Sequence, residues 1–132
     1  MGNVYSAQNI ASYLIFELKE RSFTLTKQQL QSLLRTVDMN WMNIFGNRAC
    51  QEKPHTNEIF YIEEVYSTYN EQFKQNQITE PAKEWFLSYG QFQLVYQAYK
   101  VPAFSQLEKF VIQQVLENFF AKPIRASKLI VS

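Results

Sequence analysis

Residues 26–46 carry the pattern that most constrains the fold of this chain. Apolar side chains recur there at the three-and-four spacing of one helical face, at Leu30, Leu33, Leu34, Val37, Trp41, Ile44 and Phe45. Thr26 and Gln29 have the spacing of a capping box, in which hydroxyl and amide satisfy backbone donors at a helix start. Gly46 stands where a left-handed residue would end the helix. The pattern therefore predicts a long helix that begins after Thr26 and ends at Gly46.

Four further helices are predicted from apolar spacing and from caps. One begins after the Ser6 cap and runs to about Arg21, and another takes its apolar face from residues 62–73. A third begins at the Thr79 cap, and its stripe consists of Trp85, Tyr89, Phe92, Tyr96 and Tyr99. These spacings place one apolar side of each helix against a common core.

The last predicted helix covers about residues 103–120. Its inward face is predicted to be Phe104, Leu107, Val111, Val115 and Phe119. Further apolar residues on other faces leave little of this helix polar, so it is expected to be central or paired with a second copy of the chain. A homodimer is compatible with such a surface.

Together these elements predict a mainly α fold, a single compact bundle of about five helices. The 132 residues suit one domain, which is expected to span residues 1–121. Residues 47–57 are predicted as an exposed loop and 59–62 as one short extended segment or strand. Residues 122–132 are predicted as an extended C-terminal tail.

Composition limits the classes of partner. The chain has 13 Lys and Arg residues against 12 Asp and Glu residues, which gives a net charge of +1. Most nucleic-acid-binding domains have a much larger excess of basic residues. Cys50 is the single cysteine, which suits a reducing compartment, so a cytoplasmic location is expected. No stretch reaches the 18 or so apolar residues of a membrane span, and no membrane association is expected.

The residue sets needed for catalysis or metal binding are sparse. The chain has one histidine, His55, and one aspartate, Asp38. Cys50 and His55 lie five residues apart and could meet in principle, but an ordinary loop is the more common outcome. A structural zinc site needs four Cys or His ligands, which this chain cannot supply. No catalytic residue, metal or cofactor is therefore predicted.

Aromatic residues make up 16% of the chain, and they favour protein binding as the function class. Interfaces are enriched in Tyr, Trp and Phe, although most tyrosines simply complete a core with the hydroxyl at its rim. An alternative is a helix-turn-helix DNA-binding regulator. Its second helix would then offer to DNA the side chains of Lys27, Gln28, Gln31 and Arg35.

The first third of the chain resembles the Panacea-domain family, which includes SocA-type antitoxins and many phage-associated proteins. The similar segments are Tyr5-Ser6-Ala7, Ile10-Ala11-Ser12-Tyr13-Leu14-Ile15, Leu25-Thr26 and Leu30-Gln31-Ser32-Leu33-Leu34. The middle of the chain keeps Val65-Tyr66 and Tyr69 of that pattern but lacks its glycine and prolines.

The resemblance implies a non-enzymatic antitoxin that neutralises a toxin by stoichiometric binding, as one half of a toxin-antitoxin system. A phage-encoded inhibitor of a bacterial defence complex is an alternative with the same binding mechanism and a different host target. The residues that lie where the family's middle motif would be are the expected partner contacts, namely Phe60, Tyr61, Tyr66 and Tyr69.

Overall fold

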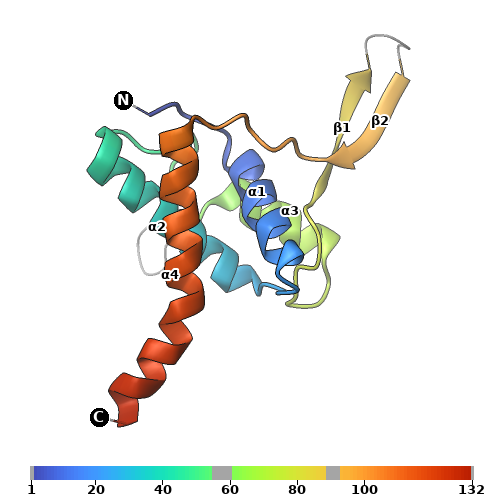
Figure 1. The fold of residues 1–132 in the computed structure, drawn as a ribbon. Coiled ribbons are helices and arrows are strands. Elements are labelled where there is room, and N and C mark those ends of the chain that lie inside the picture. The colour runs from blue at the N-terminus through green and yellow to red at the C-terminus, as the bar shows by residue number, and fades with distance from the viewer. Residues whose placement is uncertain (1, 55–60, 89–92, 132) are drawn as a thin grey trace.

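The structure is a computed structural model that describes residues 2–54, 61–88 and 93–131, with Ser88 and residues 121–131 as backbone alone (Figure 1). Over these residues it contains four helices and one two-stranded sheet. In chain order the elements are α1 (Ala7–Glu20), α2 (Lys27–Phe45), α3 (Glu63–Gln72), β1 (Lys83–Ser88), β2 (Gln93–Ala98) and α4 (Gln106–Val131). The mainly helical class is confirmed. The count of five helices is wrong, because one predicted helix is a β-hairpin.

The first two helices begin where their caps predict. Ser6 Oγ accepts a hydrogen bond from the Gln8 N–H at 3.3 Å. Thr26 and Gln29 form the complete capping box, with donor–acceptor distances of 2.9 and 3.0 Å. Gly46 ends α2 with a φ of 82°, a left-handed conformation that costs glycine little. Local signals are therefore sufficient to place α1 and α2.

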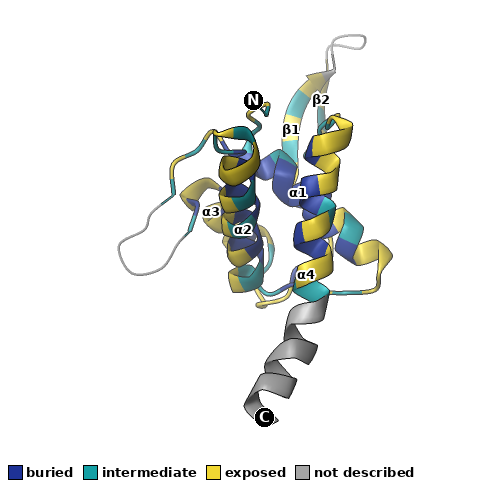
Figure 2. Cartoon of the chain, turned by 60° about the vertical axis from the view of Figure 1, so that its left-hand side comes forward, coloured by how far each residue is buried: buried dark blue, intermediate teal, exposed yellow. Residues whose placement is uncertain are grey.

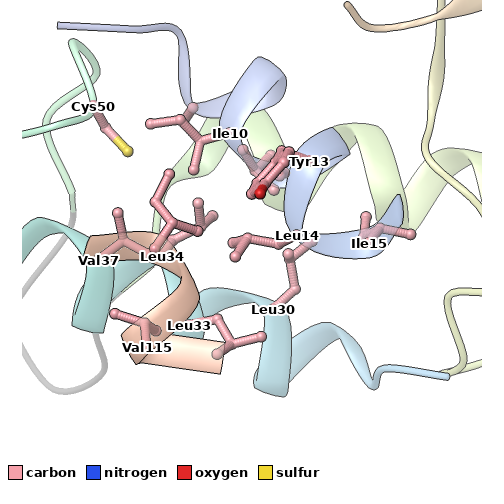
Figure 3. Close-up of a cluster of buried hydrophobic side chains, with 14 of the residues drawn as sticks. Ile10, Tyr13, Leu14, Ile15, Leu30, Leu33, Leu34, Val37, Cys50 and Val115 are labelled. Carbon is pink, nitrogen blue, oxygen red and sulfur yellow. The ribbon is translucent and has the colours of Figure 1, made fainter. Parts of the chain in front are cut away.

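The core lies where α1, α2 and α4 converge (Figure 3). Ile10 and Leu14 of α1, Leu33 and Val37 of α2, and Val115 of α4 point into one cluster in that view. All five are buried, which removes their apolar surface from water and stabilises the fold. Ile44, predicted to be buried, is exposed, whereas the next residue, Phe45, packs against the core and so takes the inward side of the last turn of α2.

The buried face of α4 differs from the predicted one. Its buried apolar residues are Val111, Ile112, Val115 and Leu116. Leu107 was predicted to face inward and is exposed, because the neighbouring Glu108 occupies the inward position. Ser105 and Glu108 cap the helix reciprocally, at 2.9 and 3.2 Å, so α4 begins at Gln106 rather than near residue 103.

α4 also extends further than predicted, through Pro123 to Val131. The predicted extended tail of residues 122–132 is thus helical over the part that the structure describes. Proline removes one backbone hydrogen bond from a helix, but residues 124–131 contain no further proline and no glycine to stop it.

The helix predicted from Thr79 is a hairpin instead. β1 and β2 pair antiparallel in six consecutive residue pairs, among them Trp85 with Tyr96 and Leu87 with Leu94. Strands favour aromatic and branched side chains, which these segments contain, and the intervening Gly90 is a poor helix residue. The hairpin projects from the helical body in both views (Figures 1 and 2).

Residues 47–54 are not simply an exposed loop, because a buried carboxylate holds their first part. Asp38 Oδ1 accepts hydrogen bonds from the N–H groups of Ala49 and Cys50, each at 3.0 Å. Asp38 Oδ2 pairs with the Arg48 guanidinium at 2.5 Å. Ala49 and Cys50 are buried as a result, and the Cys50 backbone forms a bridge with Tyr5.

The N-terminal segment is held against α2 and α4. The Trp41 Nε1–H donates to the Asn3 carbonyl at 3.1 Å. Glu108 accepts hydrogen bonds from the Asn3 N–H and the Tyr5 hydroxyl, both at 2.7 Å. A Cβ on Gly2 would lie 2.6 Å from Trp41 Nε1, so this close approach requires glycine. Residues far apart in sequence thereby close one side of the core.

Candidate functional site

A groove of about 520 Å³ lies between the N-terminal half of α2 and the start of α3. Its lining residues are Lys27, Gln28, Gln31, Ser32, Arg35, Tyr61, Glu63 and Tyr66. Lys27, Gln28, Gln31 and Arg35 were predicted as DNA contacts, and Tyr61 and Tyr66 as protein contacts. The fold brings these two sets together on one surface, which we call the α2–α3 groove.

Gln31 fixes the geometry of the groove. It is buried, its Oε1 accepts from the Ile62 N–H at 2.7 Å, and its Nε2 lies 3.4 Å from the Ile62 carbonyl oxygen. Ile62 is the residue before α3, has extended backbone, and has no side-chain cap of its own. Gln31 therefore joins α2 to the start of α3, and both ends of its amide are occupied.

Two tyrosine rings form one wall. Tyr61 and Tyr66 lie with their ring centroids 5.6 Å apart and their planes at 56°. Tyr66 is 44% exposed and Tyr61 is half-buried. Tilted aromatic pairs at this distance are favourable contacts, and they hold both rings in place. The groove thus offers apolar ring surface on this wall.

Charged side chains lie around the wall. Lys27 Nζ donates to Asn70 Oδ1 at 3.0 Å, which tethers the lysine beside α3. The exposed Arg35 forms no ion pair with any residue that the structure describes. Glu63 accepts a hydrogen bond from the Ser67 hydroxyl at 2.8 Å. Two cations and one carboxylate therefore face the groove, a balance that favours an acidic ligand group.

The other two predicted protein contacts do not line the groove. Tyr69 is buried in the core, where its ring stacks on Phe73 and its hydroxyl accepts from the Ala82 N–H at 3.0 Å. Burial raises the pKa of Tyr69 well above its ordinary value, so the hydroxyl stays protonated. Phe60 lies outside the described residues, as does Ile59 of the predicted strand.

The start of α2 is hydrogen-bonded to the segment after α3. The Lys27 N–H donates to Asn76 Oδ1 at 3.1 Å, and Asn76 Nδ2 donates to Gln28 Oε1 at 3.0 Å. Leu25 also forms an antiparallel bridge with Ile78. A DNA-recognition helix presents its N-terminal residues to base edges, whereas this helix directs them towards its own chain.

Two lining residues, Ser32 and Glu63, were not predicted as binding contacts. Ser32 shares a helical face with Gln28 and Arg35. This polar face lies opposite the apolar stripe of α2, so the spacing alone could have placed Ser32 beside them. Glu63 gave no comparable signal, because it lines the groove only through the packing of α3 on α2.

The Cys50 thiol is poorly suited to nucleophilic chemistry. Burial raises its pKa well above the ordinary value, and the neighbouring Asp38 carboxylate raises it further. A thiol that stays protonated is a weak nucleophile. His55, its candidate base, lies outside the described residues.

No group of three or more His, Cys, Asp or Glu side chains that could hold a metal occurs within the described residues. In the same part of the chain, no helix combines the length and apolar character required to span a membrane. No protein-family profile, curated protein or solved structure matches this chain.

Proposed function

We propose that this chain is a non-enzymatic, antitoxin-like protein-binding module that neutralises a partner protein by stoichiometric binding. The observation that carries the proposal is the α2–α3 groove, which places the exposed ring of Tyr66 and the guanidinium of Arg35 on one concave surface. Tyrosine and arginine are the residue types, with tryptophan, that most often dominate binding energy at protein interfaces.

The frame of the groove supports binding without a large loss of conformational freedom. The Gln31 amide fixes the start of α3 against α2, and the Lys27–Asn70 hydrogen bond joins the same two helices at another point. A surface that is already ordered pays less entropy when a ligand binds. The groove is therefore suited to hold a short segment of a folded partner.

The charges indicate the chemistry of that segment. The groove has two cations, Lys27 and Arg35, and one carboxylate, Glu63. An apolar group of the ligand would pack favourably on the tyrosine rings that form its wall. We expect an aromatic or aliphatic anchor flanked by an Asp or Glu side chain. The carboxylate would pair with Arg35, while the anchor would pack on Tyr66.

The antitoxin-like role draws on the resemblance of residues 5 to about 45 to the Panacea-domain family. A phage-encoded inhibitor of a bacterial defence complex would use the same groove and the same binding mechanism. The identity of the captured protein separates these two roles. The helix-turn-helix regulator has less support, because the first turn of α2 is hydrogen-bonded to Asn76.

The test compares two tyrosines of equal exposure. Tyr66 and Tyr96 are 44% and 45% exposed, but only Tyr66 lines the groove. Tagged wild-type protein, Tyr66→Ala and Tyr96→Ala are used to capture partners from the native host, and each captured protein is then titrated by calorimetry. We expect a one-to-one complex whose dissociation constant rises about tenfold or more with Tyr66→Ala and less than about twofold with Tyr96→Ala.

Neutralisation is then measured by co-expressing the captured protein with each variant. Wild type and Tyr96→Ala should relieve its toxic effect, and Tyr66→Ala should not. Capture of DNA alone would favour the regulator instead. Equal binding by the two tyrosine variants, or multiple turnover of a captured substrate, would refute the proposed function.

A further inference from the structure

The hairpin carries a group of exposed apolar side chains that no helix in the described part of the chain covers. Trp85, Leu87, Leu94 and Tyr96 lie on one face as two adjacent cross-strand pairs. All four are exposed, and the rings of Trp85 and Tyr96 lie 4.8 Å apart. A two-stranded hairpin is marginal in water unless further strands or a helix support it. In the described part of the chain its extensive contacts are those between its own strands.

The hydrogen-bond register determines which backbone groups point outward. The Tyr99 N–H donates to the Ala82 carbonyl at 3.2 Å, so the alternating antiparallel ladder continues through Glu84–Gln97 and Phe86–Val95. The N–H and C=O groups of the intervening residues therefore face away from the other strand. On β2 these residues are Leu94, Tyr96 and Ala98.

The two edges of the hairpin are unequal. On β1, the backbone N–H and C=O of Lys83 are bound by the Gln72 side chain at 3.0 and 2.9 Å, and charged residues occupy positions 83 and 84. β2 contains no charge and no proline, and its pairing with β1 has no bulge. Charges, prolines and bulges are the usual features that prevent a strand edge from pairing with another chain. β2 is therefore the edge open to a further strand.

We propose that the β2 strands of two copies of this chain pair antiparallel about a two-fold axis at Val95. This register places Leu94 opposite Tyr96 of the second copy, so that the outward-facing backbone groups of both strands meet. The product is a four-stranded sheet that joins two protomers. It places both sets of apolar side chains on one continuous face, because residues directly opposite each other lie on the same side of a sheet.

A second copy fits this edge better than an unrelated strand. It brings an edge of the same six-residue length and equally free of charge, so no like charges meet across the axis. On the other face, Gln93 lies opposite Gln97 of the second copy, where their amides are polar but neutral. None of the residues that line the α2–α3 groove belongs to the hairpin, so the dimer is independent of the proposed function.

Sedimentation equilibrium of the full chain tests the assembly, and two double variants test the register. Leu94→Lys with Tyr96→Lys places like charges opposite each other twice, and we expect the dimer dissociation constant to rise about tenfold or more. Leu94→Lys with Tyr96→Glu removes the same two apolar side chains but places opposite charges together. This second variant should dimerise markedly better than the first.

Hydrogen exchange gives a readout that needs no substitution. The N–H groups of Leu94 and Tyr96 should become protected as protein concentration rises through the dimer dissociation constant. Phe110→Lys, on the exposed side of α4, serves as a control that should leave the dimer intact. A monomeric wild type, equal self-association of the two double variants, unprotected β2 amides in a dimer, or loss of the dimer with Phe110→Lys would each overturn the proposal.

Discussion

The helical body and the hairpin use large apolar side chains in opposite ways. Trp41 of α2 is 0% exposed and its Nε1–H has a backbone acceptor, whereas Trp85 of β1 is 64% exposed. The body also buries charged side chains, each satisfied by several hydrogen bonds, such as those of Asp38 and Glu108. The burial classes make this contrast visible over the residues whose side chains are described (Figure 2). The difference indicates that the body provides stability, whereas the hairpin surface is available for association.

Replacing each tryptophan in turn tests this contrast most strongly. Trp41→Ala is expected to lower the free energy of unfolding by about 3–5 kcal/mol, since it leaves a cavity in the core and removes the partner of the Asn3 carbonyl. Trp85→Ala is expected to lower it by less than about 1 kcal/mol. Urea denaturation of both variants measures the difference. Similar losses would mean that the hairpin is as important for stability as the body.

Removal of the buried carboxylate should have the next largest effect. Asp38→Ala leaves the buried N–H groups of Ala49 and Cys50 without their acceptor, and we expect a loss of about 2–3 kcal/mol in the free energy of unfolding. Glu63→Ala, which removes an exposed carboxylate, serves as the control and should stay within about 0.5 kcal/mol of wild type. If the two variants were equally stable, Asp38 would not be holding residues 47–50.

A smaller effect depends on pH. Burial acts to raise the pKa of Glu108, but hydrogen bonds from Ser105, Tyr5 and Asn3 outweigh it and lower this pKa below its ordinary value. A lowered pKa in the folded state contributes stability above the ordinary glutamate pKa, and this contribution is lost as pH falls from that value through the lowered pKa of the folded state. Urea midpoints measured from neutral to acidic pH should therefore fall less steeply for Glu108→Gln than for wild type. Tyr5→Phe should give an intermediate slope, and identical slopes in all three proteins would argue against this role.

The smallest effects on stability are expected at the α2–α3 groove. Tyr66→Ala and Arg35→Ala remove exposed side chains and should each change the free energy of unfolding by less than about 0.5 kcal/mol. Thermal and urea denaturation check this expectation. A large loss would mean that the groove residues belong to the stabilising body, and reduced partner binding could then be explained by unfolding alone.

Local signals predicted the first half of the fold well. The caps at Ser6, Thr26 and Gly46 act within a few residues, so the sequence suffices to place α1 and α2. The hairpin was mistaken for a helix because Trp85 and Tyr96 are 11 residues apart, which fits three helical turns as well as a cross-strand pair. Spacing alone does not separate these two structures.

Most residues that line the groove were named from the sequence, but their arrangement was not predicted. The polar face of α2 and the aromatic residues before and within α3 were each recognised, but as alternatives that served different functions. Their meeting depends on the buried hydrogen bonds between Gln31 and Ile62, a contact over 31 residues. No local pattern predicts which buried backbone amide a glutamine side chain will bind. The sequence also does not show which side of α3 faces the core, so it does not tell the buried Tyr69 from the exposed Tyr66.

The hydrogen bond between the Asn3 N–H and Glu108 spans 105 residues, which has a consequence for synthesis of the protein. When α1, α2 and α3 have been synthesised, Glu108 and α4 have not yet left the ribosome. Glu108 binds the N-terminal segment, and α4 packs on α2. We therefore expect Trp41, which the N-terminal segment covers, to be accessible to chaperones and proteases until α4 emerges. A product halted before that point is expected to be degraded, so that only molecules containing α4 persist in the cell.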